Sequence, residues 1–158
     1  MKLTKDLREF IELLNSHHVE YLLVGGHAVA YHGHPRYTGD IDFLVRPSQE
    51  NTRRLLIVLD EFGFGDLGIT LEDLSTEGKV VQLGMPPNRI DLITAITGVS
   101  FDQAWAGRVA AHLDGLPVSV LGRNELLANK RSSGRTKDLA DLEELEGEVG
   151  AEVSRQVP

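Results

Sequence analysis

Two aspartates separated by one residue, Asp40 and Asp42, are the side chains of this sequence whose type and spacing point most directly to chemistry. They begin the apolar run "DIDFLV", which is typical of a β-strand, where side chains two positions apart share a face, about 6 to 7 Å apart. Two carboxylates at that spacing repel each other unless a cation lies between them, and Mg²⁺ binds carboxylate and substrate phosphate oxygens together. The pair therefore indicates metal-assisted chemistry at a phosphate, and the alternative is an exposed strand end with ordinary surface charge.

A third carboxylate, Asp91, lies between apolar residues in "RIDLIT", a second strand-like run. If that strand lies beside residues 40–45, three acidic side chains meet at one place. They could then hold two Mg²⁺ ions roughly 3.5 to 4 Å apart, which would stabilise the attacking and leaving oxygens in phosphoryl or nucleotidyl transfer. By itself Asp91 fits a helix cap or a salt bridge equally well, so the prediction depends on the three residues together.

Two adjacent glycines, Gly25 and Gly26, lie between the apolar run 20–24 and the helix-like "HAVAYH". Glycine lets the backbone approach a ligand closely, and the free N–H groups at a helix N-terminus attract phosphate. An isolated pair of glycines more often marks a tight turn without a ligand. The glycines therefore support a phosphate site only in combination with the aspartates.

Helices and strands alternate around these residues. Apolar residues at helical spacing behind Thr4 predict a helix over residues 4–16, and Ser48 and Gly63 have the residue types that begin and end another. The turn-forming "GMPPN" separates two runs that we expect to pair antiparallel, and Asp114-Gly115 marks a hairpin. The remaining elements are strands at 20–24, 40–45, 79–83 and 89–94 and helices at 123–133 and 136–146.

These elements predict an α+β domain with a mixed sheet. The chain has 158 residues, 41% of them hydrophobic and 25% charged, which is enough for one globular core. We expect a single domain over residues 1–147, followed by a polar, frayed tail over residues 148–158.

The composition limits where the protein works and what it binds. No apolar run approaches the roughly 20 residues of a membrane span, and the charged N-terminus does not resemble a signal segment, so we expect a cytoplasmic protein without a membrane partner. The absence of cysteine excludes thiolate metal sites and a cysteine nucleophile. The formal charge of -8 disfavours a broad nucleic-acid surface, which leaves nucleic acid only as a local acceptor.

Three histidines near the glycines, His27, His32 and His34, suggest a zinc site as a competing hypothesis. On a helix, however, His27 and His32 point about 140° away from each other, so shared coordination would require the helix to break. The lone Trp105, at helical spacing from Phe101, is more typical of a core residue than of a base-stacking platform.

Taken together, the glycines and the acids resemble the nucleotidyltransferases of the DNA polymerase beta superfamily, especially the small bacterial type related to abortive-infection toxins. The matching pattern is Val24-Gly25-Gly26, then Asp40-Ile41-Asp42-Phe43, then Ile90-Asp91-Leu92, and the stretches "HGHPRYTGDIDF" and "GRTKDLADLEEL" also resemble that subgroup. The resemblance covers roughly residues 20–146. It implies the nucleotidyltransferase fold, with a mixed, mostly antiparallel sheet flanked by helices.

The resemblance also implies roles for individual residues. Asp40 and Asp42 would hold Mg²⁺ or Mn²⁺, and Asp91 would hold one metal and help to deprotonate the attacking hydroxyl. Gly25 and Gly26 would pack against the nucleotide phosphates. Many relatives have serine where this chain has Gly26, so one hydroxyl donor to phosphate is missing here.

Basic side chains are therefore expected to contribute to phosphate binding. Arg36, with Thr38 as a weaker candidate, lies just ahead of the aspartate pair. A second group, the basic cluster, is either a solvated helix face or an anion site, and comprises Lys130, Arg131, Arg135 and Lys137.

The resulting hypothesis is a metal-dependent nucleotidyltransferase that moves NMP from an NTP, with ATP as the expected nucleotide, to a hydroxyl acceptor and releases pyrophosphate. The acceptor is open among a small molecule, a protein and an RNA end. A partner protein or a homodimer, and a role in a toxin-antitoxin or defence system, follow from the resemblance alone. The alternatives are a non-catalytic nucleotide-binding or partner-binding module on the same fold and a metal-dependent phosphohydrolase.

Overall fold

The computed structural model describes residues 2–33 and 39–156, with the backbone alone beyond residue 146. Its elements follow the chain in this order: α1 (Lys5–Ser16), β1 (Tyr21–Val24), α2 (Gly25–Tyr31), β2 (Asp40–Val45), α3 (Gln49–Phe62), the 3-10 turn η1 (Gly65–Leu67), α4 (Leu71–Ser75), β3 (Val80–Leu83), β4 (Arg89–Ile93), α5 (Phe101–Ala106), β5 (Val109–Leu113), β6 (Leu116–Val120), α6 (Arg123–Ser133) and α7 (Thr136–Gln156).

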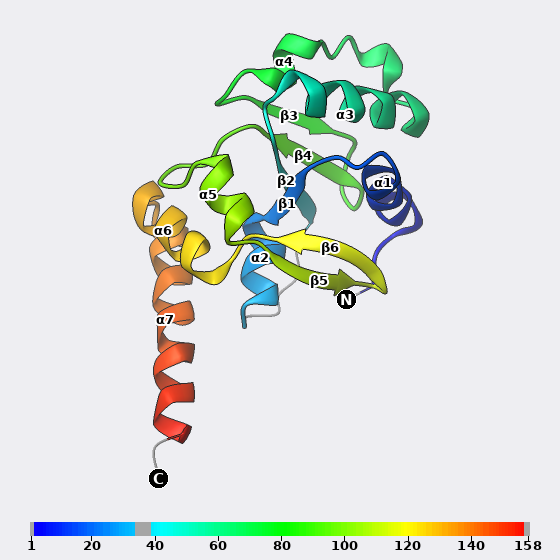
Figure 1. Ribbon diagram of the computed structural model, residues 1–158. Helices are drawn as coiled ribbons and strands as arrows, with labels where there is room; N and C mark the ends of the chain where they lie inside the picture. Colours follow the sequence, from blue (N-terminus) through cyan, green and yellow to red (C-terminus); the bar gives the residue numbers. More distant parts are fainter. Residues whose placement is uncertain (1, 34–38, 157–158) are drawn as a thin grey trace.

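Six strands form one mixed sheet in the order β3-β4-β2-β1-β6-β5 (Figure 1). The pairs β2–β4 and β1–β6 are parallel, and the other three pairs are antiparallel. The expected α+β class with a mixed, mostly antiparallel sheet is therefore confirmed. The two central strands, β1 and β2, each have a paired strand on both sides.

The element boundaries follow local signals in the sequence. The side chains of Thr4 and Ser48 accept hydrogen bonds from the backbone N–H groups three residues on and thereby cap α1 and α3. Gly63 ends α3 in the left-handed conformation, with φ of 101°. Asp114 and Gly115 both have positive φ, as a two-residue hairpin turn between β5 and β6 requires.

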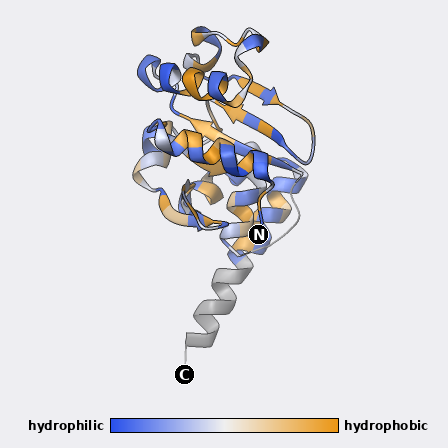
Figure 2. Ribbon diagram, turned by 90° about the vertical axis from the view of Figure 1, so that its right-hand side faces the viewer, coloured by the Kyte–Doolittle hydropathy of each residue, from blue (hydrophilic) through white to orange (hydrophobic). Residues whose placement is uncertain are grey.

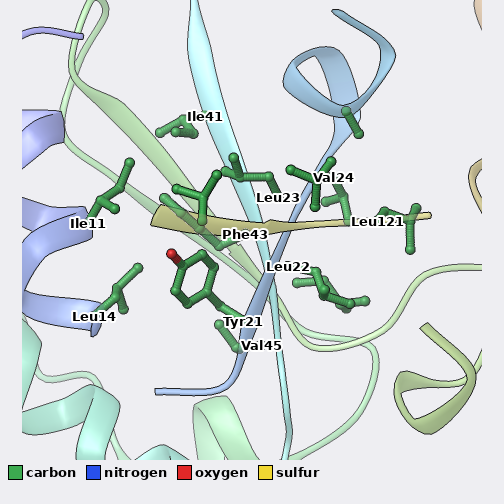
Figure 3. Packing of buried hydrophobic residues seen from close by; sticks show 14 of the residues in the cluster. Ile11, Leu14, Tyr21, Leu22, Leu23, Val24, Ile41, Phe43, Val45 and Leu121 are labelled. Carbon is green, nitrogen blue, oxygen red and sulfur yellow. The ribbon is translucent and has the colours of Figure 1, made fainter. Parts of the chain in front are cut away.

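One face of β2 is part of the hydrophobic core. Phe43 of β2 contacts Phe10 of α1 and Tyr21 of β1, with ring centroids 5.6 and 5.5 Å apart. Figure 3 shows Ile11 and Leu14 of α1 on the same side of the sheet as the rings of Tyr21 and Phe43. Burying an apolar side chain of this size stabilises the folded state by about 1.5 to 3 kcal/mol relative to leaving it exposed. Because side chains alternate along a strand, this packing directs Asp40 and Asp42 to the opposite face.

Amphipathic helices cover the sheet, and the strands between them carry mostly apolar residues (Figure 2). Phe62 near the end of α3 packs edge-on against Phe10, with centroids 5.2 Å apart, so α1 and α3 share one layer. Further along β2, Leu44 lies on the aspartate face and is also buried. Both faces of β2 are therefore covered at its end, and its beginning, where the aspartates lie, is more open.

Two features differ from the expectation. The final helix was expected to end near residue 146, but α7 continues to Gln156. A single glycine in a helix costs only about 1 kcal/mol relative to alanine, so Gly147 does not end the helical backbone. The structure also adds the short helices α4 and α5, which begin with capping boxes at Thr70 and Ser100.

The aromatic residues Phe101 and Trp105 of α5 pack against the core with stacked rings 5.8 Å apart, which fits the structural interpretation of the lone tryptophan. Among the residues that the structure describes, no helix combines the length and the apolar character that crossing a bilayer would require.

Candidate active site

The parallel pairing of β2 with β4 brings the three predicted carboxylates together. Asp42 lies directly opposite Asp91 in the register of the two strands. One oxygen from each of Asp40, Asp42 and Asp91 lies within 4.8 Å of the other two. Within residues 2–33 and 39–146, these three form the one group of histidine and acidic side chains arranged closely enough to hold a metal ion.

The electrostatic environment of these carboxylates is unfavourable to three negative charges. The pKa of Asp42 is raised to about 7, chiefly by burial and also by its hydrogen bond to Asp91 and the charges of Asp91 and Asp40, while Arg89 acts in the opposite direction. Asp91 itself is buried. At neutral pH the cluster therefore favours either a bound proton or a bound cation.

The donor set fits a hard divalent cation. All three ligand atoms are carboxylate oxygens, the type that Mg²⁺ and Mn²⁺ prefer, and the remaining coordination positions of such an ion are commonly filled by water and substrate phosphate. Asp40, Asp42 and Asp91 would hold the ion, and a cation among them would offset the burial and the repulsion that raise the pKa of Asp42.

Gly25 follows β1 directly and lies against Asp42. Its φ is 62°, and a Cβ built at this position would lie 2.2 Å from Oδ2 of Asp42. The register explains the contact, because Val24, the preceding residue, lies opposite Asp42. Gly25 is therefore required both for the turn into α2 and for close approach of the backbone to a carboxylate of the cluster, whichever ligand the site binds.

We expect Gly25→Ala to displace the Asp42 side chain and to destabilise the protein by more than the roughly 1 to 2 kcal/mol that a left-handed alanine costs. The matched control is Gly134→Ala, because Gly134 has a φ of 64° and no atom within 4 Å of an added Cβ. Thermal unfolding of both variants separates the two effects. Equal losses of stability would show that the contact with Asp42 is unimportant.

The members of the basic cluster differ in their burial and in their partners. The ammonium group of Lys130 is 2.9 Å from Asp138 Oδ1 and 3.3 Å from Asp141 Oδ2, and all three side chains are buried. Arg135 pairs with Asp138, whereas Lys137 is exposed. Neither a solvated face nor an open anion site describes Lys130, which instead joins α6 to α7 through buried ion pairs.

The carboxylate of Asp138, which pairs with Lys130, is kept ionised by its neighbours. Burial alone would raise the pKa of Asp138, but hydrogen bonds from Arg135, Ser133 and Lys130 hold it well below its usual range. The Lys130 ammonium group therefore has anionic protein partners already, which leaves it less available to phosphate than the sequence suggested.

The other predicted phosphate contacts remain predictions. Arg36 and Thr38 lie outside the described residues, as does His34. Gly26 is the second residue of α2 and is partly exposed. Arg131 pairs with Glu146 at the surface, and no described contact links Lys137 to the three carboxylates.

The remaining two histidines have other surroundings. His32 Nε2 is 2.7 Å from the carbonyl oxygen of Leu121, to which it donates a hydrogen bond. Burial lowers the pKa of His27, while the charge of Asp40 acts in the opposite direction. His27 is therefore close enough to the carboxylate cluster for the charge of Asp40 to act on it, whereas His32 forms a hydrogen bond to the backbone.

Arg89 is a residue of this site that the sequence interpretation missed. Its Nε is 3.2 Å from Asp91 Oδ1, and its Nη2 is 3.4 Å from Asp91 Oδ2. The signal was present, since residues two apart in a strand share a face and "RID" places an arginine two positions before the acid.

The raised pKa of Asp42 predicts how stability depends on pH when metal is absent. The unfolded carboxylate ionises near 3.8 and the folded one near 7, so the folded state loses stability as pH rises through that window. We expect the melting temperature in EDTA to fall by several degrees between pH 5 and pH 8, because about 1 kcal/mol moves it by roughly 2 to 4 °C in a domain of this size.

Mg²⁺ should restore the melting temperature at pH 8 more than at pH 5, because it binds the ionised carboxylates. The lowered pKa of His27 acts in the opposite direction below pH 6.5, so the informative quantity is the difference between the wild type and Asp42→Asn. A difference that does not change with pH would contradict the assignment.

Comparison with solved structures identifies the fold. ANT(2″)-Ia in complex with adenylyl-2″-tobramycin matches with 14% identity over 92% of this chain and 88% of that chain, with a TM-score of 0.57. A putative nucleotidyltransferase from Thermotoga maritima matches with 18% identity over 90% and 91% of the two chains and the same TM-score of 0.57. An antigenic nucleotidyltransferase-like protein from Paracoccidioides brasiliensis matches with 17% identity over 89% and 74%, with a TM-score of 0.50.

The chain therefore has a nucleotidyltransferase fold, as the resemblance in sequence predicts. The sequence matches no protein-family model and no curated protein sequence. At identities of 14 to 18% the structural likeness establishes the fold, and the chemistry must be argued from the site itself.

Proposed function

We propose that this protein is a metal-dependent nucleotidyltransferase that transfers NMP from an NTP to a hydroxyl acceptor and releases pyrophosphate. The observation that carries the proposal is the meeting of Asp40, Asp42 and Asp91 within 4.8 Å on two adjacent parallel strands of a nucleotidyltransferase fold. The three acids do not stabilise the metal-free fold as ionised groups, since burial and the neighbouring carboxylates raise the pKa of Asp42.

In the reaction, the acceptor oxygen forms a bond to the α-phosphorus and the bond from that phosphorus to the β-phosphate oxygen breaks. The hydroxyl proton must leave the acceptor, and Asp91 is the proposed site that receives it. Asp40, Asp42 and Asp91 would hold Mg²⁺ or Mn²⁺, which when bound supplies charge neutralisation and polarises the phosphate. The protein contributes position and electrostatics, which suffice for phosphoryl-type transfer.

Gly25 contributes to the same geometry. By lying against Asp42 without a side chain, it leaves room for the carboxylate to face its two partners and for a phosphate to approach the backbone. Lys137, exposed in the first turn of α7, remains the proposed phosphate-binding cation of the C-terminal helices.

We favour a small molecule as the acceptor and ATP as the donor. The structural neighbour ANT(2″)-Ia is described in complex with adenylyl-2″-tobramycin, which is a nucleotidylated small molecule. The formal charge of -8 opposes a broad RNA-binding surface. A cytoplasmic location, a partner protein or second copy, and a toxin-antitoxin or defence role stay hypotheses that rest on the sequence alone.

The test is incubation of the protein with each α-labelled NTP, Mg²⁺ and cell lysate, followed by measurement of pyrophosphate and of the labelled product. Label transfer with stoichiometric pyrophosphate supports the proposal. Release of free nucleotide or phosphate without a labelled acceptor would indicate a phosphohydrolase.

Thermal unfolding with NTP distinguishes the non-catalytic alternative. At about 100 times the dissociation constant, a ligand adds roughly 2.7 kcal/mol of stability. NTP should raise the melting temperature only when Mg²⁺ or Mn²⁺ is present, because the phosphates and the carboxylates repel each other without it. Binding without pyrophosphate release would indicate a nucleotide-binding module.

A further inference from the structure

Arg89 has a place in the site that its ion pair with Asp91 does not fully explain. The guanidinium group faces both oxygens of Asp91, but at 3.2 and 3.4 Å. Charge-assisted bonds of this type are commonly about 2.7 to 2.9 Å long. The pair is therefore held loosely, and the fork of the guanidinium is free to meet another anion of similar shape.

Strand β4 positions Arg89, its first residue, at the open end of the carboxylate cluster. Arg89 lies opposite Asp40 in the register of β2 and β4, and it shares a face with Asp91 because the two are two residues apart. The side chain of Arg89 is 33% exposed, whereas that of Asp91 is 9% exposed. The guanidinium thus lies between solvent and the buried acid.

A divalent cation and this guanidinium compete for the same oxygens. Asp91 takes part in the hydrogen bond with Asp42 and in the ion pair with Arg89 at once. A cation bound among the carboxylates would repel Arg89 and draw on the same lone pairs. The displaced guanidinium then needs an anionic partner, and a phosphate group matches its planar fork as well as a carboxylate does.

Several other cations on the described part of the chain are already paired with acids outside the carboxylate cluster. Lys130 and Arg135 bind Asp138 in the corner between α6 and α7. Arg46 binds Glu20 and Asp102 beyond the far end of β2. Among the described arginines, Arg89 is the one whose ion-pair partner is itself a member of the candidate metal site.

We propose that Arg89 exchanges partners: it neutralises Asp91 in the metal-free protein and moves to the triphosphate when a metal-bound nucleotide enters. This role rests on the proposed function, because the triphosphate is the anion that the exchange requires. It makes Arg89 a phosphate-binding residue that favours the metal-nucleotide complex over the metal ion alone.

The test uses two probes that the exchange affects in opposite directions. Mn²⁺ alone is titrated by electron paramagnetic resonance, and Mg²⁺ with a non-hydrolysable NTP analogue is titrated by calorimetry. Arg89→Gln should bind Mn²⁺ several-fold more tightly, because the competing cation is gone, and should bind the analogue about 10- to 100-fold more weakly. Arg89→Lys, which keeps the charge and loses the fork, should recover only part of the analogue affinity.

Arg53→Gln is the matched control, because Arg53 is an exposed arginine of α3 whose described bond is to Gln49. If Arg89→Gln binds both Mn²⁺ and the analogue more weakly, Arg89 only holds Asp91 in place. If its affinity for the analogue is unchanged, the proposed exchange of partners is wrong. Mn²⁺ with inorganic tripolyphosphate separates this failure from failure of the proposed function. If the wild type binds tripolyphosphate but no NTP analogue, and Arg89→Gln loses tripolyphosphate, the exchange stands and the nucleotide assignment falls.

Discussion

Replacing Asp42 by asparagine is expected to reduce nucleotidyl transfer by about a thousandfold or more, which corresponds to roughly 4 kcal/mol of activation free energy. Asp42 is paired in register with Asp91, and one of its oxygens lies within 4.8 Å of an oxygen of each of the other two acids, so a metal bound among the three would use Asp42. Asparagine keeps the shape of the side chain and removes the charge that holds a cation.

The same substitution should not unfold the protein. The raised pKa of Asp42 means that its ionised form is disfavoured in the metal-free fold, and the neutral amide removes that repulsion at pH 8. Asp66→Asn is the control, since Asp66 is an exposed acid in the 3-10 turn η1. Steady-state pyrophosphate release and thermal unfolding are measured for both variants. If Asp42→Asn transferred nucleotide at close to the wild-type rate, the assignment of Asp42 as a metal ligand needed for transfer would be wrong.

Lys130→Met is expected to be the most destabilising change outside the core, by about 3 to 5 kcal/mol, because it leaves buried carboxylates without their central cation. Lys130 bridges Asp138 and Asp141, and all three side chains are buried. Arg135 and Ser133 continue to bond Asp138, so the loss should lie toward the lower end of that range. Urea denaturation at pH 7 gives the free energy of unfolding directly.

Arg131→Met provides the comparison, since Arg131 is one residue away on α6 and its ion pair with Glu146 is exposed. Exposed pairs contribute about 0 to 1 kcal/mol, so this variant should remain close to the wild type. The double variant Lys130→Met with Asp141→Leu should be less unstable than the sum of the single changes, because it removes charge on both sides. Similar stabilities of Lys130→Met and Arg131→Met would contradict the buried network.

Much of the fold follows from short-range signals. Thr4, Ser48 and Gly63 mark helix ends because each satisfies or terminates a local set of backbone groups, and Asp114-Gly115 marks a hairpin because both residue types tolerate the positive φ of a two-residue turn. The aspartates were found for a similar reason. Two acids within an apolar strand conflict with burial, and a conflict of that kind marks a functional site.

The sequence did not predict the features that depend on neighbours across the fold. Nothing near Lys130 in the sequence shows that it is buried, because its acidic partners, Asp138 and Asp141, come from the next helix. Asp42 and Asp91 could be placed on strands, but their register depends on the whole segment between them. Arg89 was missed because an arginine before an acid is common on strands that bind nothing.

The pairing of β2 with β4 has a consequence for how the protein folds. The two strands are neighbours in space, yet α3, η1, α4 and β3 all lie between them along the chain. Closing so long a loop has an entropic cost that is recovered only when the intervening segment has folded and docked, so non-local parallel pairs of this kind form slowly. Helices such as α1 can reach their final conformation far earlier. Affinity for a divalent cation is therefore gained at the end of refolding, and a metal-binding signal reports completion of the sheet rather than formation of the helices.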